Sequence, residues 1–290
     1  MATGVLFVCA TPIGNLEDVT LRLLRVLREV DLIAAEDTRT TRKLLSRYEI
    51  ATPLVSYHAH SDQKRLAELL ARLAEGQKVA LVSEAGTPGI SDPGLPLVEA
   101  ALSAGIGVEA VPGPSAVVTA LSIAGLPTGR FAFEGFLPLR GADRRRRLRE
   151  LAMERRTMVI YEAPHRLLAT LADLEEALGD RPAAVARELT KRFEEVFRGT
   201  LSAARARFAS GERRGEFTLV VQGLMGAAAE EEGPAEEAPA GEVSLGEAAL
   251  QLVEREGLSL KAAAQRVAAE RGCSRNEVYR HALACRERGV

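Results

Sequence analysis

Short apolar runs alternate with amphipathic helical segments through the first 125 residues, and this rhythm limits the fold more than any other feature of the chain. The runs have the length of buried strands and lie at residues 5–10, 32–36, 53–57, 78–83 and 108–112. After the first run, Leu23 and Leu27 follow helical spacing, while Arg22 and Arg25 fall on the other side. Strands separated by helices pair in parallel, so we predict an α/β domain that binds its ligand at the carboxyl ends of its strands.

A second series of apolar runs indicates a second α/β domain. These runs lie at residues 131–137, 157–163, 183–188, 194–199 and 217–223. The last three follow one another closely enough to indicate a mixed sheet. We therefore expect two α/β domains, residues 1–125 and 126–225, with a cleft between them.

The rest of the chain divides into a linker and a helical tail. Residues 226–242 contain six acidic residues and no large apolar one, which is typical of a disordered linker. In residues 243–290, N-cap signals precede three short helical segments, at Ser244, Ser259 and Ser274. We expect this tail to form a small all-α domain.

The turn around Gly272 gives the last two tail helices the spacing of a helix-turn-helix. Arg275 and Arg280 decorate the last helix, together with Asn276 and His281. These side chains suit contact with nucleic acid. The same pattern also suits a small bundle that only packs against the body of the protein or against a second subunit.

The net charge of −2 hides an uneven distribution of charge. The linker carries six carboxylates and no basic residue, which leaves the rest of the chain mildly basic. Arginine supplies 33 of the 38 basic residues, and its guanidinium group suits two-pronged contacts with phosphate. The composition is therefore compatible with a nucleic-acid partner.

Several common classes of protein are disfavoured by what the sequence lacks. No apolar run approaches the ~20 residues of a membrane span, and the N-terminus has no basic signal region, so we expect a cytoplasmic protein without a membrane partner. The three cysteines include no C-x-x-C pair, and the close pair His58 and His60 is typical of a surface, so we expect no metal. There is no G-x-G-x-x-G after a strand, no P-loop and no G-x-S-x-G motif.

Polar loops at the ends of the predicted strands form the candidate binding site. They occupy residues 10–18, 35–40, 83–94, 111–116, 161–166 and 187–195. In the third loop, three glycines let the backbone approach a ligand closely, while Pro88 and Pro93 stiffen it. Taken singly, a loop could simply begin a helix, with Asp37, Thr38 or Ser115 as the cap. Taken together, the loops predict the lining of a cleft.

These six loops, in this order, resemble those of the ribosomal RNA small-subunit methyltransferase I family, the branch of the tetrapyrrole-methylase superfamily that acts on RNA. The resemblance covers residues 5–223, and the tail is similar to the extra C-terminal domain of many members. It implies two α/β domains of the tetrapyrrole-methylase type with a cofactor cleft between them, S-adenosylmethionine as cofactor, and a homodimer. It also implies methyl transfer to the ribose 2′-hydroxyl of a cytidine in the decoding region of small-subunit rRNA, free or in an assembled subunit.

By position, the resemblance assigns cofactor contacts to segments on all sides of the expected cleft. The residues are Pro12, Ala85, Gly86, Thr87, Ile90, Ser91, Ser115, Ala116, Tyr161, Glu162, Ala163, Leu189 and Thr218. A helix that begins near Ser115 would direct backbone N–H groups toward the carboxylate of the cofactor. One departure from the family lies beside these residues, because Glu84 stands where relatives commonly have Asp.

A ribose hydroxyl is a poor nucleophile, so a nearby carboxylate that accepts its proton would help the reaction. We rank Asp37 and Asp92 first as candidate catalytic residues. The other loop carboxylates considered are Glu36, Glu162 and Glu188. Asp37 and Asp92 could each instead cap a helix that begins just after it.

Basic residues near the loops and on the tail are predicted to contact RNA. The arginine run at 140–149 is the strongest electropositive feature, and from it we select Arg144, Arg145, Arg146 and Arg147. The other predicted contacts are Arg39, His165, Arg166, Arg275 and Arg280. Plain solvation of the run, and ion pairs for the others, are the structural alternatives.

Two other functions stay open at the level of sequence. A methylase of a small tetrapyrrole-like substrate would need neither the arginine run nor the tail. A nucleic-acid-binding regulator would use the tail and sense a nucleotide-like ligand through the α/β body. Turnover of S-adenosylmethionine would separate both enzymes from the regulator.

Overall fold

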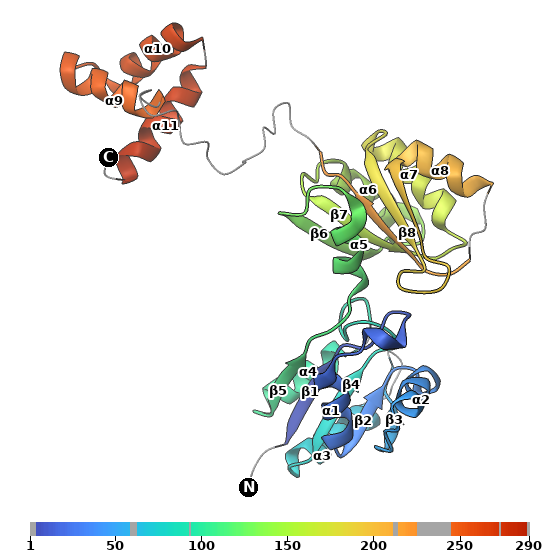
Figure 1. The fold of residues 1–290 in the computed structure, drawn as a ribbon. Helices are drawn as coiled ribbons and strands as arrows, with labels where there is room; N and C mark the ends of the chain where they lie inside the picture. The colour runs from blue at the N-terminus through green and yellow to red at the C-terminus, as the bar shows by residue number, and fades with distance from the viewer. Residues whose placement is uncertain are drawn as a thin grey trace. The chain divides into compact units, whose positions relative to one another are not determined.

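The structure, a computed structural model, describes residues 4–58, 63–92, 94–210, 214–224, 245–272 and 274–288. It divides into two compact units, residues 1–226 and 227–290. The first unit contains two five-stranded sheets with their helices (Figure 1), and the second is helical. The predicted fold class is thereby confirmed. The linker predicted at 226–242 lies outside the described residues.

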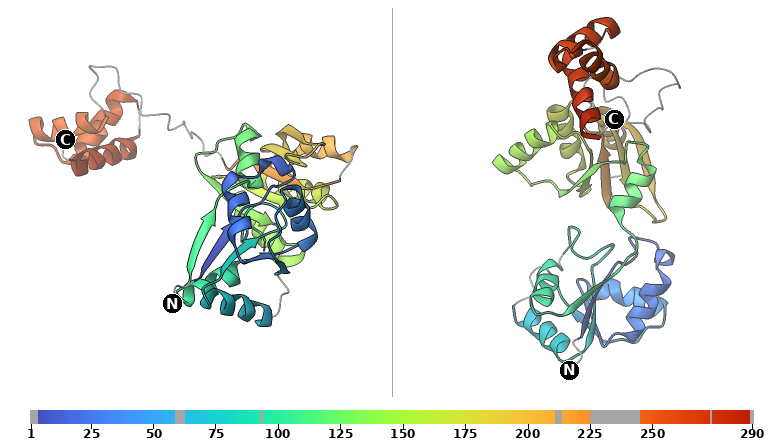
Figure 2. Two further views of the ribbon diagram at one scale, coloured as in Figure 1. Left: turned by 60° about the horizontal axis from the view of Figure 1, so that its bottom comes forward. Right: turned by 90° about the vertical axis from the view of Figure 1, so that its left-hand side faces the viewer.

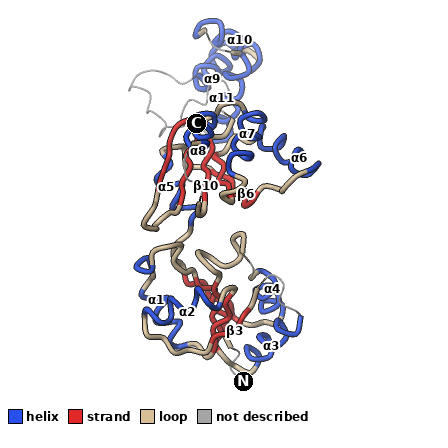
Figure 3. The backbone as a smooth tube through the Cα atoms, turned by 90° about the vertical axis from the view of Figure 1, so that its right-hand side faces the viewer, coloured by secondary structure: helices blue, strands red, loops and turns tan. Residues whose placement is uncertain are grey.

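The N-terminal sheet is entirely parallel, as the alternation of strands and helices predicts, and its strand order is β3-β2-β4-β1-β5. The strands are β1 (Val5–Cys9), β2 (Leu32–Ala35), β3 (Leu54–Ser56), β4 (Lys78–Val82) and β5 (Gly107–Val111). The helices are η1 (Leu16–Asp18), α1 (Leu21–Glu29), α2 (Thr38–Arg47), α3 (Gln63–Ala74) and α4 (Leu95–Ser103). As Figure 3 shows, α1 and α2 cover one face of the sheet and α3 and α4 the other.

Alternate residues of the central strand β4 pack into opposite layers. Val79 and Leu81 belong to the core under α3 and α4, whereas Ala80 and Val82 belong to the core under α1 and α2. Both faces of the strand are buried, which explains why the sequence shows a continuous apolar run here instead of an alternating one. Polar side chains therefore gather in the loops at the ends of the strands.

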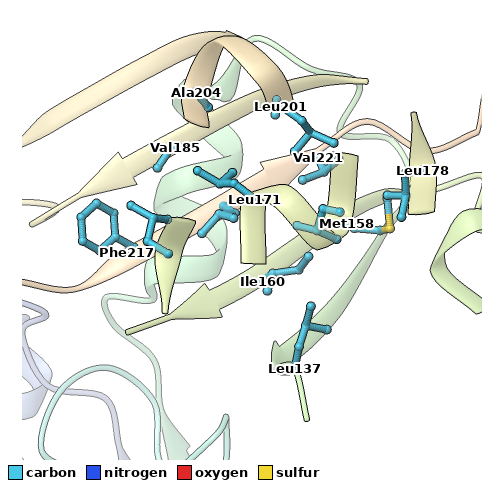
Figure 4. Packing of buried hydrophobic residues seen from close by; sticks show 14 of the residues in the cluster. Leu137, Met158, Ile160, Leu171, Leu178, Val185, Leu201, Ala204, Phe217 and Val221 are labelled. Atoms are coloured by element: carbon cyan, nitrogen blue, oxygen red, sulfur yellow. The ribbon is translucent and has the colours of Figure 1, made fainter. Parts of the chain in front are cut away.

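The C-terminal sheet is mixed, as predicted, and its order is β6-β7-β10-β8-β9. Only the β6–β7 pair is parallel among the strand pairs of this described sheet. The strands are β6 (Phe131–Phe136), β7 (Thr157–Glu162), β8 (Pro182–Arg187), β9 (Glu195–Thr200) and β10 (Phe217–Val221). One face packs against α6 (Gly141–Ala152), α7 (Leu167–Leu178) and α8 (Leu201–Ala209), and Figure 4 shows Met158, Ile160 and Leu171 within this core.

The helix α5 (Ala116–Ala124) covers the other face of the C-terminal sheet. Its Val117 and Leu121 share a buried cluster with Val159 of β7 and Val220 of β10. The sequence-based division places this helix in residues 1–125, but its packing partners belong to the second sheet. The chain therefore reaches the second sheet directly after β5, and the loop before α5 lies where the two sheets meet.

The tail forms three helices, as predicted: α9 (Leu245–Glu256), α10 (Leu260–Arg271) and α11 (Arg275–Arg288). The three helices pack against one another (Figure 2). Their small core includes Ala263, Val267 and Val278. The Ser259 hydroxyl accepts the N–H of Ala262 and so caps α10. Gly272 ends the same helix with a φ of 69°, a left-handed conformation that favours glycine.

Candidate active site

A cavity of about 300 Å³ lies between the two sheets of the first unit. It is bounded by the loops that follow β1, β4, β5, β7 and β8, and by the start of β10. Its lining consists of Ile13, Glu84, Ala85, Gly86, Thr87, Ile90, Ser91, Asp92, Ser115, Ala116, Phe136, Tyr161, Glu162, Ala163, Pro164, Leu189, Gly215, Glu216, Phe217 and Thr218. The carboxyl ends of the parallel strands thus meet the cavity, as expected for ligand sites in α/β folds.

The loop after β4 presents its backbone to the cavity because glycines let it turn there. Gly86 and Gly89 have φ values of 79° and 84°, and Ser91 also lies in the left-handed region at 62°. The loop is held to the loop after β1 by a pair of backbone hydrogen bonds. Thr11 N donates to Gly86 O at 2.9 Å, and Gly86 N donates to Thr11 O at 3.1 Å. The close approach of these two loops fixes one wall of the cavity.

The N-terminus of α5 opens toward the cavity. Its N-cap is Ser115, which lines the cavity together with Ala116. In the described structure, the Ser115 side chain makes no capping hydrogen bond to the first turn. The first backbone N–H groups of a helix lack partners within the helix, and the helix dipole favours an anion beside them. This end of α5 therefore suits a carboxylate.

Carboxylates give the cavity a negative character. Glu84, Asp92 and Glu216 all line it. Burial, and then the nearby Glu36 carboxylate, raise the pKa of Asp92 from 3.8 to about 6. Burial also raises the pKa of Glu84, and Asp37 is the next largest cause. Several carboxylates that oppose one another's ionisation would be relieved by a positively charged ligand.

Aromatic and aliphatic side chains line the rest of the cavity. Tyr161 is flanked by Phe133 and Phe136, with ring centroids 5.0 and 5.8 Å from its own in edge-to-face geometry. Burial raises the pKa of Tyr161 to about 12, so the phenol is neutral at physiological pH. Together with Ile13 and Leu189, the rings of Tyr161 and Phe136 provide apolar surface for a flat ligand group.

The fourth carboxylate of the lining, Glu162, is neutralised from behind. Its side chain is fully buried, and its Oε1 lies 3.2 Å from Arg166 Nε. The same oxygen accepts the N–H of Ala163 at 2.8 Å, and Oε2 accepts the Thr170 hydroxyl. Glu162 therefore forms a rigid part of the wall.

Comparison with known proteins shows the family to which the chain belongs. The model of the tetrapyrrole (corrin/porphyrin) methylases matches residues 5–205. A protein of Synechocystis sp. named ribosomal RNA small subunit methyltransferase I is 47% identical over 281 residues, which cover 97% of this chain and 98% of that one. A Thermotoga maritima protein of the same name is 52% identical over 220 residues, covering 76% of this chain and 99% of its own length. This chain belongs to the ribosomal RNA small subunit methyltransferase I family.

Solved structures give the same fold for this family member. The uroporphyrin-III-C-methyltransferase of Thermus thermophilus is 26% identical, with a TM-score of 0.53 over 76% of this chain and 94% of that chain. A structure described as the same enzyme complexed with S-adenyl homocysteine is 22% identical, with a TM-score of 0.54 over 75% and 96%. Because the second structure is only 22% identical, its similarity shows the fold alone.

The structure gathers nearly all the predicted cofactor residues of this family member at one cavity. Each of them lines it except Pro12, which is buried beside the lining residue Ile13. Asp92 also lines it, and it does not cap α4, because the N-cap of that helix is Gly94. These placements bring the residues together; their assignment to a cofactor stays a prediction.

Asp37 lies outside the cavity lining and caps a helix. Its side chain accepts the backbone N–H of Arg39 at 2.7 Å, at the N-terminus of α2. It also pairs with the Arg39 guanidinium at 2.9 Å, and the Arg39 hydrogen bonds lower the pKa of Asp37 to about 2. A carboxylate of such low pKa is a weak base. The capping alternative therefore describes Asp37, and the ion-pair alternative describes Arg39.

The predicted RNA contacts differ widely in their surroundings. His165, Arg145 and Arg275 are exposed, and Arg166 is bound to Glu162. The side chain of Arg280 lies outside the described parts of α11. The predicted RNA contact of Arg144 is wrong, because the Arg144 side chain is buried.

The Arg144 guanidinium forms hydrogen bonds within the protein. It donates to Asp173 Oδ2 at 2.7 Å, to Thr170 Oγ1 at 2.9 Å and to the carbonyl of Pro138 at 3.0 Å. Arg146 pairs with Asp143 at 2.8 Å, and Arg147 pairs with Glu134 and Glu150. Arg145 thus differs from the other three predicted arginines of the run.

Sequence reasoning missed several residues of the lining. They are Ile13, Glu84, Phe136, Pro164, Gly215, Glu216 and Phe217. Glu84 could have been found, because it directly precedes the selected Ala85, and Pro164 could have been found, because it lies between Ala163 and His165. Gly215 and Glu216 carry no recognisable motif, and they reach the cavity because the antiparallel strand β10 begins there.

Among the described residues, no group of three His, Cys, Asp or Glu side chains is arranged to hold a metal ion. Within the same residues, no helix is long and apolar enough to cross a membrane.

Proposed function

We propose that this chain transfers a methyl group from S-adenosylmethionine to the ribose 2′-hydroxyl of a cytidine in small-subunit rRNA, as a cytoplasmic homodimer. Membership of the family supports the class of reaction, because its relatives carry that activity in their name. The structural observation that carries the proposal is one cavity whose wall combines the open end of α5, apolar rings and carboxylates.

The described residues fit the chemical parts of S-adenosylmethionine. Tyr161 and Leu189 offer apolar surface to a planar base, and the first turn of α5 offers N–H groups to a carboxylate. Glu84, Asp92 and Glu216 favour the positive charge of a sulfonium or ammonium group. When bound, the cofactor supplies an electrophilic methyl group on a positively charged sulfur. We assign the predicted residues of the lining to this ligand.

Asp92 is the carboxylate best suited to accept the ribose proton. It lines the cavity, and its pKa of about 6 leaves it ionised at pH 7 yet more basic than an ordinary aspartate. Asp92 would accept the proton of the ribose hydroxyl as that oxygen takes up the methyl group, and the bound cofactor would supply the activated methyl group and the leaving group. Alignment of the two reactants is the larger task, because the methyl group is already activated.

Exposed apolar side chains support the homodimer. Leu95 and Leu102 on α4 are 58% and 59% exposed, and they offer apolar surface to a second copy. The oligomeric state in solution, from light scattering, tests this part of the proposal. A monomer at micromolar concentration would contradict it.

The decisive experiment is methyl transfer from labelled S-adenosylmethionine to small ribosomal subunits from cells that lack this protein. Nuclease mapping then locates the label. We expect label at one cytidine, at a linkage that resists alkaline cleavage because a 2′-O-methyl group removes the internal nucleophile. Naked rRNA, offered in parallel, distinguishes free RNA from the assembled subunit as substrate.

Two outcomes would favour the other functions. Cofactor binding without transfer to subunits or to naked rRNA would favour a small tetrapyrrole-like substrate. Nucleic-acid binding without any turnover of S-adenosylmethionine would favour a regulator.

A further inference from the structure

A second hollow lies between α6 and α7, which pack side by side on the C-terminal sheet (Figure 1). Its volume is about 690 Å³. The residues that line it include Leu139, Arg140, Arg144, Arg145, Arg149 and Arg166. We call this hollow the α6–α7 groove. Among the described residues, it shares no lining residue with the cavity of the candidate active site.

Three arginines of the α6–α7 groove carry charge that no described residue neutralises. Among the described residues, Arg140, Arg145 and Arg149 have no carboxylate partner, and all three are exposed. The acidic members of the lining are Asp173, which is paired with Arg144, and Glu176. The groove therefore has a net positive charge available to a ligand.

The positions of these arginines suit a chain of phosphates. Arg145 and Arg149 are four residues apart in α6, so they project from the same side of the helix. Arg140 is the N-cap of α6, where the helix dipole adds positive character. Leu139 is 73% exposed at the edge of the groove and offers apolar surface to a sugar or base.

The floor of the groove is also the back of the active-site wall. Arg144 and Arg166 line the groove, and both are connected to Glu162 by hydrogen bonds or an ion pair. Arg166 pairs with Glu162 directly, while Arg144 donates to Thr170, which donates to Glu162. Since Glu162 lines the cavity, a single layer of bonded side chains separates groove from cavity.

We propose that the α6–α7 groove binds the sugar-phosphate backbone of the substrate RNA, with Arg140, Arg145 and Arg149 as the phosphate contacts. The inference rests on the proposed function and adds the place where the RNA docks. It also changes the expected contacts, because Arg144 holds the floor of the groove and Arg146 and Arg147 are paired within the protein. A polyanion held here lies beside the cavity in which the methyl group is transferred.

The salt dependence of RNA binding tests this proposal on the full-length chain. The test variant is Arg145→Gln/Arg149→Gln, and the probe is an unmethylated transcript of small-subunit rRNA. The control, Arg25→Gln/Arg72→Gln, removes the same charge from α1 and α3, outside the groove. Each phosphate contact contributes roughly 0.7 to 0.9 to the slope of log K against log salt concentration. We expect the test variant to lose about 1.5 from that slope and about tenfold in affinity.

Further measurements keep a failure of the groove distinct from other failures. The Arg145→Lys/Arg149→Lys variant retains the charge and should recover most of the slope. All variants should bind S-adenosylmethionine as the wild-type chain does and unfold at its temperature, because Arg145 and Arg149 are exposed. If the wild-type chain methylates rRNA while the glutamine variant matches the control in slope and affinity, the groove proposal is overturned and the proposed function stands. If the wild-type chain neither binds nor methylates rRNA, both are overturned.

Discussion

The cavity and the α6–α7 groove lie on two sides of one wall, yet their charges are opposite. The cavity gathers Glu84, Asp92 and Glu216 around apolar side chains. The groove displays Arg145 and Arg149 to solvent. A small acidic cavity with apolar walls suits a small ligand with a positive centre, whereas a larger basic groove suits an extended polyanion. The difference implies two ligands held at the same time, which is what a transfer reaction between a cofactor and a nucleic acid requires.

The wall between the two sites is internally neutral. Glu162 pairs with Arg166, and Asp173 pairs with Arg144. Thr170 joins the two pairs by donating to Glu162 and accepting from Arg144. Because these charges are satisfied within the protein, they add little field to either site. The arginines of the wall are therefore distinct in role from the exposed arginines of the groove.

The largest expected effect concerns that distinction. Arg144→Ala should lower the free energy of unfolding by about 3 kcal/mol, because Asp173, Thr170 and the Pro138 carbonyl lose a charged donor. Arg145→Ala, next to it in sequence, should change stability by less than about 0.5 kcal/mol, because its side chain is exposed. Urea denaturation of both variants makes the measurement. Equal losses of stability in the two variants would show that Arg144 and Arg145 do not differ in role.

Helical periodicity explains why the sequence alone did not separate these arginines. Arg144 lies on the same side of α6 as Leu148 and Leu151, at spacings of four and seven, and all three are buried. A run of arginines looks uniformly solvated when it is counted as charge. Its position relative to the apolar residues of the helix decides which guanidinium is buried, and that pattern was present in the sequence.

Loss of the proposed base should have the next largest effect. Asp92→Asn should lower the rate of methyl transfer about 10²-fold, or ~2.7 kcal/mol in the barrier, the lower range for general base catalysis. The wild-type rate should rise with pH to a plateau above pH 6, because the pKa of Asp92 is about 6. The variant should show no such rise. A wild-type rate that is constant between pH 5 and 8 would remove Asp92 from the proton transfer.

Stability should respond to Asp92 in the opposite sense. Its pKa is raised from 3.8 to about 6 in the folded protein, so the folded state binds more protons than the unfolded state between these values. The wild-type chain should therefore lose stability as the pH rises through this window. Asp92→Asn cannot ionise, so it should be the more stable protein at pH 7. Thermal unfolding of both proteins from pH 4 to 7 measures the difference.

The fold and most of the cavity lining could be predicted, because the signals that mark them are local in the sequence. The strands of both sheets are continuous or closely spaced apolar runs. Gly86 and Gly89 identify the loop after β4 as a candidate binding loop. Phe136 and Glu216 could not be found in this way. They reach the cavity only because β6 and β10 end or begin beside β7, and that pairing is a property of the folded sheet.

The smallest expected effect is that of substituting Asp37, which tests whether the reacting site is confined to the cavity. Asp37→Ala should cost about 1 kcal/mol of stability, because the α2 N-cap loses its hydrogen bond to the N–H of Arg39. Asp37→Asn keeps an oxygen acceptor and should lose less. Neither change should alter the rate of methyl transfer more than about twofold under saturating substrate, because Asp37 lies outside the lining of the cavity. A rate loss for the asparagine variant as large as that for Asp92→Asn would extend the reacting site to α2. In that case the carboxylates that matter for catalysis would not be confined to the cavity.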